Sequence, residues 1–269
     1  MLIVSSPTDK WFKEAIRTCK ESLTVASPFV GDYLPSALAA IDRPIECTLL
    51  TRTLLADFAS GSSDFEAVVK VARRFGGVLS LSSLHAKVYV VDRSKALVTS
   101  ANATFSGMYR NRECGIEITQ RTTVEDIARN IVEGFGALSA PQRWSLADLE
   151  SMRGPIEAFR AAMPKASNLK SASISASPRL KLKQTQIDRL ASELPGWMQL
   201  TLEGVTRIPS DEFTLQQVYD SCLPIVTKTY PSNQHPKQKL RQQLQRLRDL
   251  GLVSFLGKGS YERLVVVGQ

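Results

Sequence analysis

The chain has 269 residues, of which 43% are hydrophobic, and this is enough to bury one large or two modest cores. It has no run of about 18 apolar residues, and no basic stretch precedes its first apolar residues, so we expect neither a membrane span nor a signal peptide. The four cysteines form no CxxC pair, which argues against zinc and a disulfide framework and favours a reducing cytoplasm.

The net charge of +8 is spread unevenly along the chain. Residues 1–163 hold 19 basic and 18 acidic residues, whereas residues 178–269 hold 13 basic and 8 acidic residues. Two further lysines and no acid lie between them. The excess of positive charge therefore predicts a separate polyanion-binding module in the second half.

The first 163 residues alternate between strand-like and helix-like segments. The pattern predicts strands at 2–4, 23–26, 45–51, 78–81, 85–92, 96–99 and 114–119. It predicts helices at 9–21 (with Thr8 as the N-cap), 64–75 (ended by Gly76-Gly77), 124–137 and 146–162. Such alternation is typical of an α/β fold with a mixed sheet.

Four polar side chains stand close together in the predicted hairpin of residues 85–102. His85 and Lys87 are two apart on one strand and share a face, and Ser100 and Asn102 are two apart after the next strand. An imidazole, an ammonium, a hydroxyl and a carboxamide can together bind and attack a phosphate. The alternative is a buried strand with an incidental histidine, which leaves Lys87 unexplained.

These residues resemble the HKD signature of the phospholipase D superfamily. The residues that match in order and spacing are His85, Lys87, Asp92, Ser100 and Asn102, with Glu113 at the position of the family's acidic residue. One departure is Thr99, where the family often has glycine before the serine. The resemblance implies a phospholipase D-like mixed-sheet domain.

The resemblance also implies metal-independent phosphodiester hydrolysis without a cofactor. His85 would attack phosphorus, while a second histidine protonates the leaving oxygen and later activates water. Lys87, Ser100 and Asn102 would stabilise the developing charge. Glu113 would hydrogen-bond the far nitrogen of His85, and Asp92 is the structural member of the motif.

This mechanism needs two histidines, and the sequence has one motif. The other histidine, His235, has no lysine two residues later, and we interpret it as a cap or surface residue. The second catalytic His85 is therefore expected from another subunit. This predicts a homodimer formed through the catalytic domain, with one composite site at the interface.

Residues 164–178 are rich in serine and lie within a longer stretch without acidic residues. We interpret them as a flexible basic linker between a first domain at 1–163 and a second at 179–269. The alternative is a surface loop within a single domain.

The last 90 residues predict a winged helix-turn-helix. A helix begins near Thr214, a second spans 236–250 with a core stripe of Leu240, Leu244 and Leu247, and a hairpin of 252–256 and 261–267 follows. Its predicted DNA contacts are Lys237, Lys239, Arg241, Gln242, Gln245, Arg246, Arg248 and Lys258. An ordinary solvated basic helix is the alternative.

Three stretches carry a second resemblance: Phe213 to Tyr219, Tyr230 to Asn233, and Lys239 to Tyr261. They resemble the winged-helix domain of Dam-replacing type restriction endonucleases. This implies binding to double-stranded DNA with GATC-like sites, and some family members read N6-methyladenine. Trp197 could contact such a methyl group or belong to the core.

Together these features predict a restriction-type endonuclease in which adenine methylation is either required or blocking. A phospholipase or phosphatidyl transferase, and a catalytically inactive DNA-binding regulator, are the alternatives. The first usually carries two HKD motifs in a longer chain, and the complete set of motif residues argues against the second.

Overall fold

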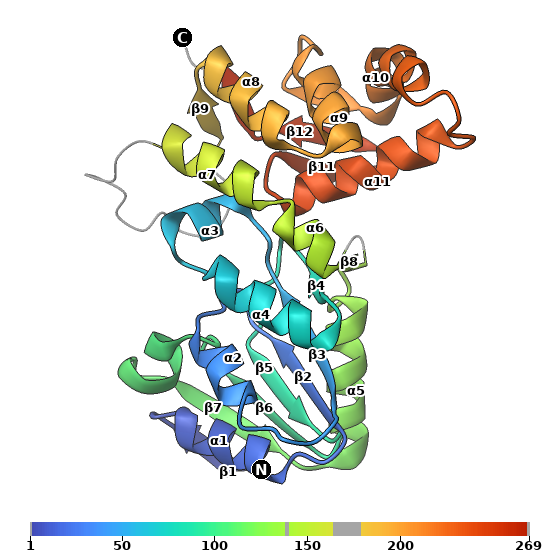
Figure 1. Ribbon diagram of the computed structural model, residues 1–269. Helices are drawn as coiled ribbons and strands as arrows, with labels where there is room; N and C mark the ends of the chain where they lie inside the picture. The colour runs from blue at the N-terminus through green and yellow to red at the C-terminus, as the bar shows by residue number, and fades with distance from the viewer. Residues whose placement is uncertain (1, 138–139, 164–178, 268–269) are drawn as a thin grey trace. The chain divides into compact units, whose positions relative to one another are not determined.

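The computed structural model describes residues 2–137, 140–163 and 179–267 (Figure 1). These residues form two compact units, each described here by itself. Unit 1 comprises Met1–Thr53 and Ser60–Glu150, and unit 2 comprises Leu54–Ala59 and Ser151–Gln269. Residues 164–178, the expected linker, lie outside the described residues.

Unit 1 is built on an eight-stranded sheet in the order β1-β7-β6-β5-β2-β3-β4-β8. The strands β2, β3 and β4 pair in parallel, and every other pair in the sheet is antiparallel. This confirms the mixed sheet expected from the sequence. The strands are β1 (Leu2–Ser5), β2 (Ser22–Ala26), β3 (Glu46–Thr51), β4 (Val78–Ser80), β5 (Val88–Val91), β6 (Lys95–Thr99), β7 (Cys114–Ile118) and β8 (Gln142–Trp144).

Helices cover both faces of this sheet, with α5 on one face and α1, α2 and α4 on the other (Figure 1). On the α5 face, Val124 and Ile131 pack with strand residues such as Val88 and Val90. The helices are α1 (Asp9–Thr18), α2 (Tyr33–Leu38), α4 (Phe65–Phe75), α5 (Arg121–Glu133) and α6 (Leu146–Glu150), with a π-helix, η1, at Ser106–Arg110.

The expected capping residues can be compared with the structure at helices α4 and α1. Helix α4 begins where the Asp64 carboxylate accepts the Ala67 N–H, and it ends at Gly76, whose φ of 78° suits glycine. Thr8 is the N-cap residue of α1, as expected, but its side chain makes no capping hydrogen bond, and its buried hydroxyl has no partner among the described residues. The helix also ends at Thr18, where the chain turns into β2.

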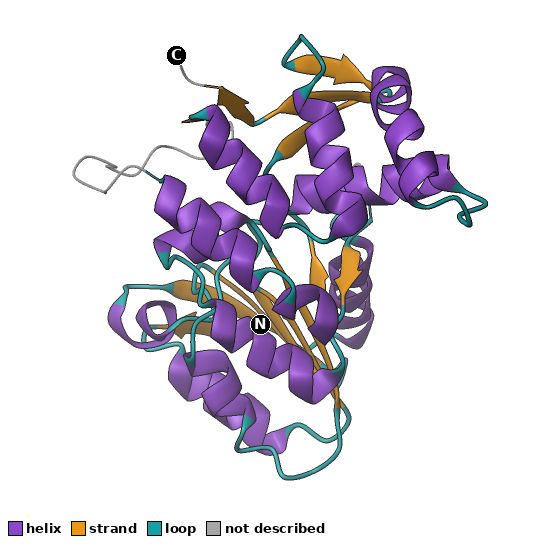
Figure 2. Ribbon diagram, turned by 45° about the horizontal axis from the view of Figure 1, so that its top comes forward, coloured by secondary structure: helices purple, strands orange, loops and turns teal. Residues whose placement is uncertain are grey.

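Unit 2 contains helices and two small sheets (Figure 2). The three-stranded sheet has the order β10-β12-β11, and β9 pairs with β13 in parallel. The helices are α3 (Leu55–Ser60), α7 (Arg153–Ala162), α8 (Gln184–Glu193), α9 (Gly196–Thr206), α10 (Leu215–Thr229) and α11 (Pro236–Asp249). The strands are β9 (Leu180–Leu182), β10 (Glu212–Thr214), β11 (Val253–Gly257), β12 (Ser260–Arg263) and β13 (Val265–Val267).

Two expected elements are divided. The helix expected over 146–162 is split into α6 and α7, and α7 packs against α8 within unit 2, although the sequence interpretation assigned it to the first domain. The second hairpin strand, expected over 261–267, is split into β12 and β13. Among the described residues, no helix combines the length and the apolar character needed to cross a bilayer.

Candidate active site and nucleic-acid interface

The strand register brings the motif residues to one edge of the sheet in unit 1. His85 and Lys87 precede β5, Ser100 and Asn102 follow β6, and Glu113 precedes β7. Because β6 pairs antiparallel with both β5 and β7, the start of β5, the end of β6 and the start of β7 meet. The predicted gathering of these side chains therefore follows from the sheet itself.

His85 and Lys87 lie just before the hydrogen-bonded part of β5, which begins at Val88 rather than at the expected His85. The pairing still extends to Lys87, whose carbonyl accepts the Thr99 N–H at 3.1 Å. The Nζ of Lys87 lies 3.4 Å from the Nε2 of His85, and the imidazole is exposed. Their spacing of two therefore places the ammonium and the imidazole together.

The surroundings of Lys87 shift its pKa in opposite directions. Burial lowers the pKa of the Lys87 ammonium, and the nearby Arg52 guanidinium lowers it further. The Glu113 carboxylate acts in the opposite direction, and the net result is a pKa below the usual lysine range. Lys87 is thus a partly desolvated cation, which interacts more strongly with an anion than a fully hydrated one would.

Glu113 is held by neutral donors in this structure. Its carboxylate accepts the Ser100 hydroxyl in a short hydrogen bond and the side-chain amide of Asn111 at 3.0 Å. The expected hydrogen bond from His85 to Glu113 is not formed among the described residues. Instead, Glu113 fixes Ser100, whose oxygen also accepts the Cys114 N–H at 3.2 Å.

Asn102 presents an unused polar group. Its Oδ1 is buried and has no hydrogen-bond partner among the described residues. The π-helix η1 packs against its backbone, since a Cβ on Gly107 would lie only 2.5 Å from the Asn102 carbonyl oxygen. The backbone of Asn102 is therefore fixed, and its buried Oδ1 is an acceptor without a donor among the described residues.

Asp92 lies at the opposite end of β5 from the other motif residues. Its carboxylate accepts the backbone N–H groups of Lys20, Glu21 and Ser22 at 2.9, 2.8 and 3.0 Å. Burial on its own would raise the pKa of Asp92, but these N–H groups outweigh it and hold the pKa below its ordinary value. The residue ties the start of β2 to the end of β5.

Two residues near the site were missed by sequence reasoning. Arg52 directly follows β3, and its guanidinium stacks 4.6 Å from the centre of the Phe29 ring. Asn111 bonds Glu113 from the loop before β7. The signal for Arg52 was its place directly after a predicted strand, whereas nothing in the sequence marked Asn111.

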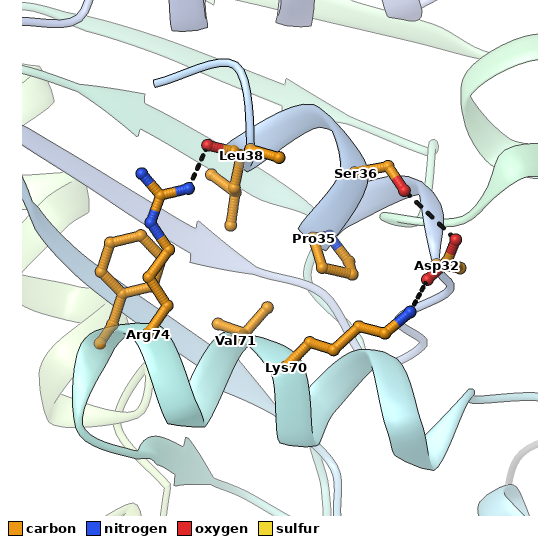
Figure 3. A pocket seen from close by; sticks show the side chains of 9 residues that line it. Asp32, Pro35, Ser36, Leu38, Lys70, Val71 and Arg74 are labelled. Atoms are coloured by element: carbon orange, nitrogen blue, oxygen red, sulfur yellow. Dashed lines mark hydrogen bonds and ion pairs between the residues drawn. The ribbon is translucent and has the colours of Figure 1, made fainter. Parts of the chain in front are cut away.

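A cavity of about 310 Å³ lies elsewhere in unit 1, between α2 and α4 (Figure 3). Lys70 forms an ion pair with Asp32 at 2.6 Å there, and the Arg74 guanidinium donates to the Leu38 carbonyl. None of the nine residues that line it belongs to the motif. The candidate active site is therefore the open sheet edge and not this cavity.

Helix α11 in unit 2 has one buried face, formed by the expected stripe of Leu240, Leu244 and Leu247. Of the predicted DNA contacts, the exposed ones are Lys237, Arg241, Gln242 and Lys258, and the half-exposed ones are Lys239, Gln245 and Arg246. Arg248 differs, because its side chain is only 11% exposed and pairs with the buried Asp249 at 2.9 Å. Arg248 therefore contributes to the packing of the domain and not to its exposed basic surface.

One aromatic residue, Tyr219, contacts two of these cations. Lys237 lies over the Tyr219 ring at 5.3 Å, and the Arg241 guanidinium donates to the Tyr219 hydroxyl at 2.7 Å. Lys258 occupies the turn between β11 and β12 with a φ of 49°, between two glycines that also have positive φ. Basic groups therefore lie both on α11 and at the tip of the hairpin.

Trp197 is half-buried at the start of α9 and stacks on Tyr230. The ring centres are 4.9 Å apart and the planes differ by 15°. The two expectations for Trp197, a core role and a base contact, are both compatible with a half-exposed stacked pair.

Two families match the sequence in separate ranges. Residues 12–134 match the family described as "Cardiolipin synthase, PLD-like domain", and residues 193–263 match the "Dam-replacing HTH domain". The first range holds all the motif residues, and the second holds α9 to α11 and the β11–β12 hairpin.

Several solved structures are similar to parts of the chain. Nuc from Salmonella typhimurium, a phospholipase D family member, is 18% identical, with a TM-score of 0.45 over 54% of this chain and 97% of that one. NucT from Helicobacter pylori is 13% identical, with a TM-score of 0.42 over 53% and 98%. Phosphatidylserine synthase from Haemophilus influenzae Rd KW20 is 15% identical, with a TM-score of 0.45 over 85% and 59%.

The two family matches, and not these distant structural likenesses, decide the assignment. The motif residues lie in the matched first range, and the basic helix and hairpin lie in the matched second range. The chain therefore joins a phospholipase D-like domain to a C-terminal winged-helix domain of the Dam-replacing type, as both sequence resemblances predicted.

Proposed function

We propose that the protein is a restriction-type DNA endonuclease that cleaves phosphodiesters without a metal ion. The observation that carries this proposal is the convergence of His85, Lys87, Ser100 and Asn102 at one sheet edge, in a chain that also has a winged-helix domain. A phospholipase D-like domain supplies phosphodiesterase chemistry, and the basic second domain favours DNA as the substrate.

In the proposed reaction, His85 Nε2 forms a bond to phosphorus and the bond to the leaving oxygen breaks. A second histidine donates a proton to that oxygen. The same histidine then takes a proton from water, the water oxygen attacks phosphorus, and the P–N bond breaks to restore His85. Lys87 and the amide of Asn102 stabilise the charge on the phosphoryl oxygens.

We infer that the second histidine is His85 of another copy of the chain. His235, the other histidine of the sequence, precedes α11 in unit 2 and is exposed. A two-fold homodimer would supply two copies of the HKD motif to one composite site. It would also present two winged helices to a pseudo-palindromic DNA site.

The winged-helix domain would read the DNA through the exposed basic and amide groups of α11. Arginine pairs with guanine and glutamine with adenine in the major groove, which makes Arg241 and Gln242 the first candidates for base contacts. Lys258 at the hairpin tip would contact phosphate. The Trp197–Tyr230 pair is our candidate for contact with a methylated adenine.

A plasmid-cleavage assay in EDTA tests the proposed chemistry. We expect nicking or linearisation to persist with the chelator and to disappear in His85→Ala, with DNA binding retained. The matched control is His235→Ala, which removes the other imidazole and should keep cleavage. Cleavage by His85→Ala, or loss of all cleavage in EDTA, contradicts the proposed mechanism.

Two substrate comparisons test the specificity. The same plasmid prepared with and without adenine methylation should be cleaved in one form and spared in the other. Phosphatidyl transfer is the second candidate, favoured by the description of the family that matches residues 12–134. Turnover of a phospholipid without any DNA cleavage would support that candidate instead. The cytoplasmic location expected from the cysteines stays a prediction.

A further inference from the structure

Two exposed aromatic rings lie at the π-helix η1, next to the candidate active site. Phe105, the N-cap residue of η1, is 51% exposed, and Tyr109 within it is 37% exposed. Their ring centres are 4.9 Å apart. We call these two residues the aromatic platform, and we propose that it stacks on an unpaired nucleobase of the DNA strand whose phosphate occupies the site.

The aromatic platform is held close to the motif residues. Phe105 follows Asn102 by three residues, which limits the distance between their Cα atoms to about 11 Å. The helix η1 packs directly on Asn102, because a Cβ on Gly107 would lie 2.5 Å from the Asn102 carbonyl oxygen and 2.8 Å from its nitrogen. A base on the platform would therefore belong to a nucleotide that flanks the bound phosphate.

A chain of ring contacts connects the aromatic platform to the sheet face that carries Lys87. Tyr89 lies two residues after Lys87 on β5 and shares its face. The Tyr89 ring lies 5.1 Å from Phe12 of α1, which lies 5.9 Å from Tyr33 of α2, and Tyr33 lies 5.8 Å from Tyr109. Helices α1 and α2 cover this face (Figure 1). The platform and the ammonium are therefore on the same side of the sheet.

The charge around the aromatic platform favours a polyanion as its partner. Residues 93–112 include no acidic residue, and Arg110 and Arg112 are exposed. The Arg110 guanidinium lies 5.0 Å from the centre of the Phe105 ring. Exposed rings that stack on bases, with cations that bind phosphates, are the usual means of holding single-stranded nucleic acid. A two-fold contact of this surface with its own copy would instead bring like charges together.

The aromatic platform also restricts the form of the DNA that it can bind. Inside a duplex, each base is stacked between its neighbours, so a protein ring can stack only on a base that is unpaired or turned out of the helix. The inference rests on the proposed function, in which the site binds a DNA phosphodiester. It adds that the strand in the site has at least one unpaired base.

Binding of short oligonucleotides to the full-length His85→Ala protein tests the aromatic platform without cleavage. A single strand of thymidines is compared with an abasic strand of the same length by fluorescence anisotropy. Phe105→Leu keeps an apolar side chain but removes the ring. We expect it to weaken binding of the thymidine strand by at least about 5-fold, the lower end of one base–ring stack, and to leave the abasic strand unchanged. Phe105→Tyr should retain the binding.

The matched control is Phe135→Leu, at a phenylalanine beyond the end of α5 that is 40% exposed. It should change the binding of neither strand. Equal effects of Phe105→Leu on both strands, or no effect on either, overturn the inference. A thymidine strand that binds no more tightly than the abasic strand also overturns it. So does a change in the sedimentation of the DNA-free Phe105→Leu protein, which would assign the platform to a contact between copies.

Plasmid cleavage by proteins that retain His85 separates failure of this inference from failure of the proposed nuclease. If Phe105→Leu weakens only the thymidine strand but the unaltered protein cleaves no DNA, the platform stands and the nuclease proposal fails. If the unaltered protein cleaves DNA but Phe105→Leu binds both strands as before, the nuclease proposal stands and the platform fails.

Discussion

At the scale of single residues, the candidate active site contains an ammonium whose surroundings disfavour its charge. Lys87 is partly buried and lies near Arg52, and both effects lower its pKa. A phosphodiester bound in the site would raise the pKa of Lys87 again, because its negative charge favours the ammonium. The sequence predicted Lys87 itself, because the motif fixes its spacing from His85. It could not predict Arg52 as a neighbour, because that proximity depends on the pairing of β2 with both β3 and β5.

The pH dependence of cleavage should reflect this environment. Activity that needs the Lys87 ammonium is complete below its pKa and is lost as the pH rises through it. We expect the alkaline limb of kcat/KM below the ordinary lysine range, and Arg52→Met should move it to higher pH by removing a like charge. Arg121→Met on the surface of α5 is the control and should leave the limb in place. If the alkaline limb of kcat/KM stays at the same pH in Arg52→Met, it does not report the Lys87 ammonium beside Arg52.

Asp92 should act on stability rather than on chemistry. Its pKa is lowered, so the stabilisation is present above the ordinary aspartate pKa and is lost as the pH falls through the lower folded-state value. Asp92→Asn should lower the free energy of unfolding by about 2 kcal/mol at neutral pH, since hydrogen bonds to a charged acceptor are lost. Urea unfolding measures this. Asp42→Asn, at a side chain that is 91% exposed, should change little.

Glu113 marks the limit of sequence reasoning about side chains. Its position in the motif was enough to place it beside Ser100 in the candidate active site, and the register of β6 and β7 explains why. Its partners, Ser100 and Asn111, depend on rotamers and on a loop conformation that no spacing rule encodes. Ligand binding that draws Ser100 toward phosphate would release one Glu113 oxygen for another donor.

At the scale of elements, the periodicity of apolar residues predicted long helices well. It failed for short helices. Helix α4 was expected at 64–75 and spans Phe65–Phe75, because Asp64 and Gly76 supply local start and stop signals. Helix α2 has only six residues and contains Pro35, so its pattern is too short to detect. The break between α6 and α7 was missed because the apolar period continues across it.

The hairpin tip offers a test of the predicted DNA contacts. A phosphate contact adds to the salt dependence of binding, so Lys258→Ala should reduce the log–log slope by about 0.9 while weakening all sequences alike. Fluorescence anisotropy with the full-length His85→Ala protein measures this without cleavage. Lys181→Ala, an exposed lysine on β9, is the matched control. A slope that Lys258→Ala leaves unchanged would remove the hairpin tip from the DNA interface.

At the scale of the whole molecule, the uneven charge predicts two modules with different tasks, and the two family matches lie in separate ranges, 12–134 and 193–263. The charge also predicts that the second module, and not the first, binds a polyanion. The exact content of the units could not be predicted, because α3 joins unit 2 although it lies between β3 and α4 in the sequence. Only the tertiary contacts of residues 54–59 show that a segment from the first half of the chain belongs to unit 2.

Coexpression tests whether two chains share one site. If His85 from both copies is required, a dimer with one His85→Ala chain is inactive. Random pairing of equal amounts would leave about one quarter of the dimers active. Plasmid cleavage by the coexpressed chains, purified through one tag that both carry, measures this. Activity of about one half would instead indicate independent sites. Coexpression with His235→Ala is the control and should retain full activity.

The short helix α3 has a practical consequence for how this protein can be divided. Its Leu55 N–H bonds the Leu250 carbonyl, and the carbonyls of Phe58 and Ala59 accept the Arg160 guanidinium, all within unit 2. A fragment that starts at residue 179 lacks α3 and α7 and so exposes the surfaces that they cover. Exchanging the winged-helix domain between related chains at the linker would therefore remove part of unit 2, and a stable chimaera should carry residues 54–59 and 151–163 with it.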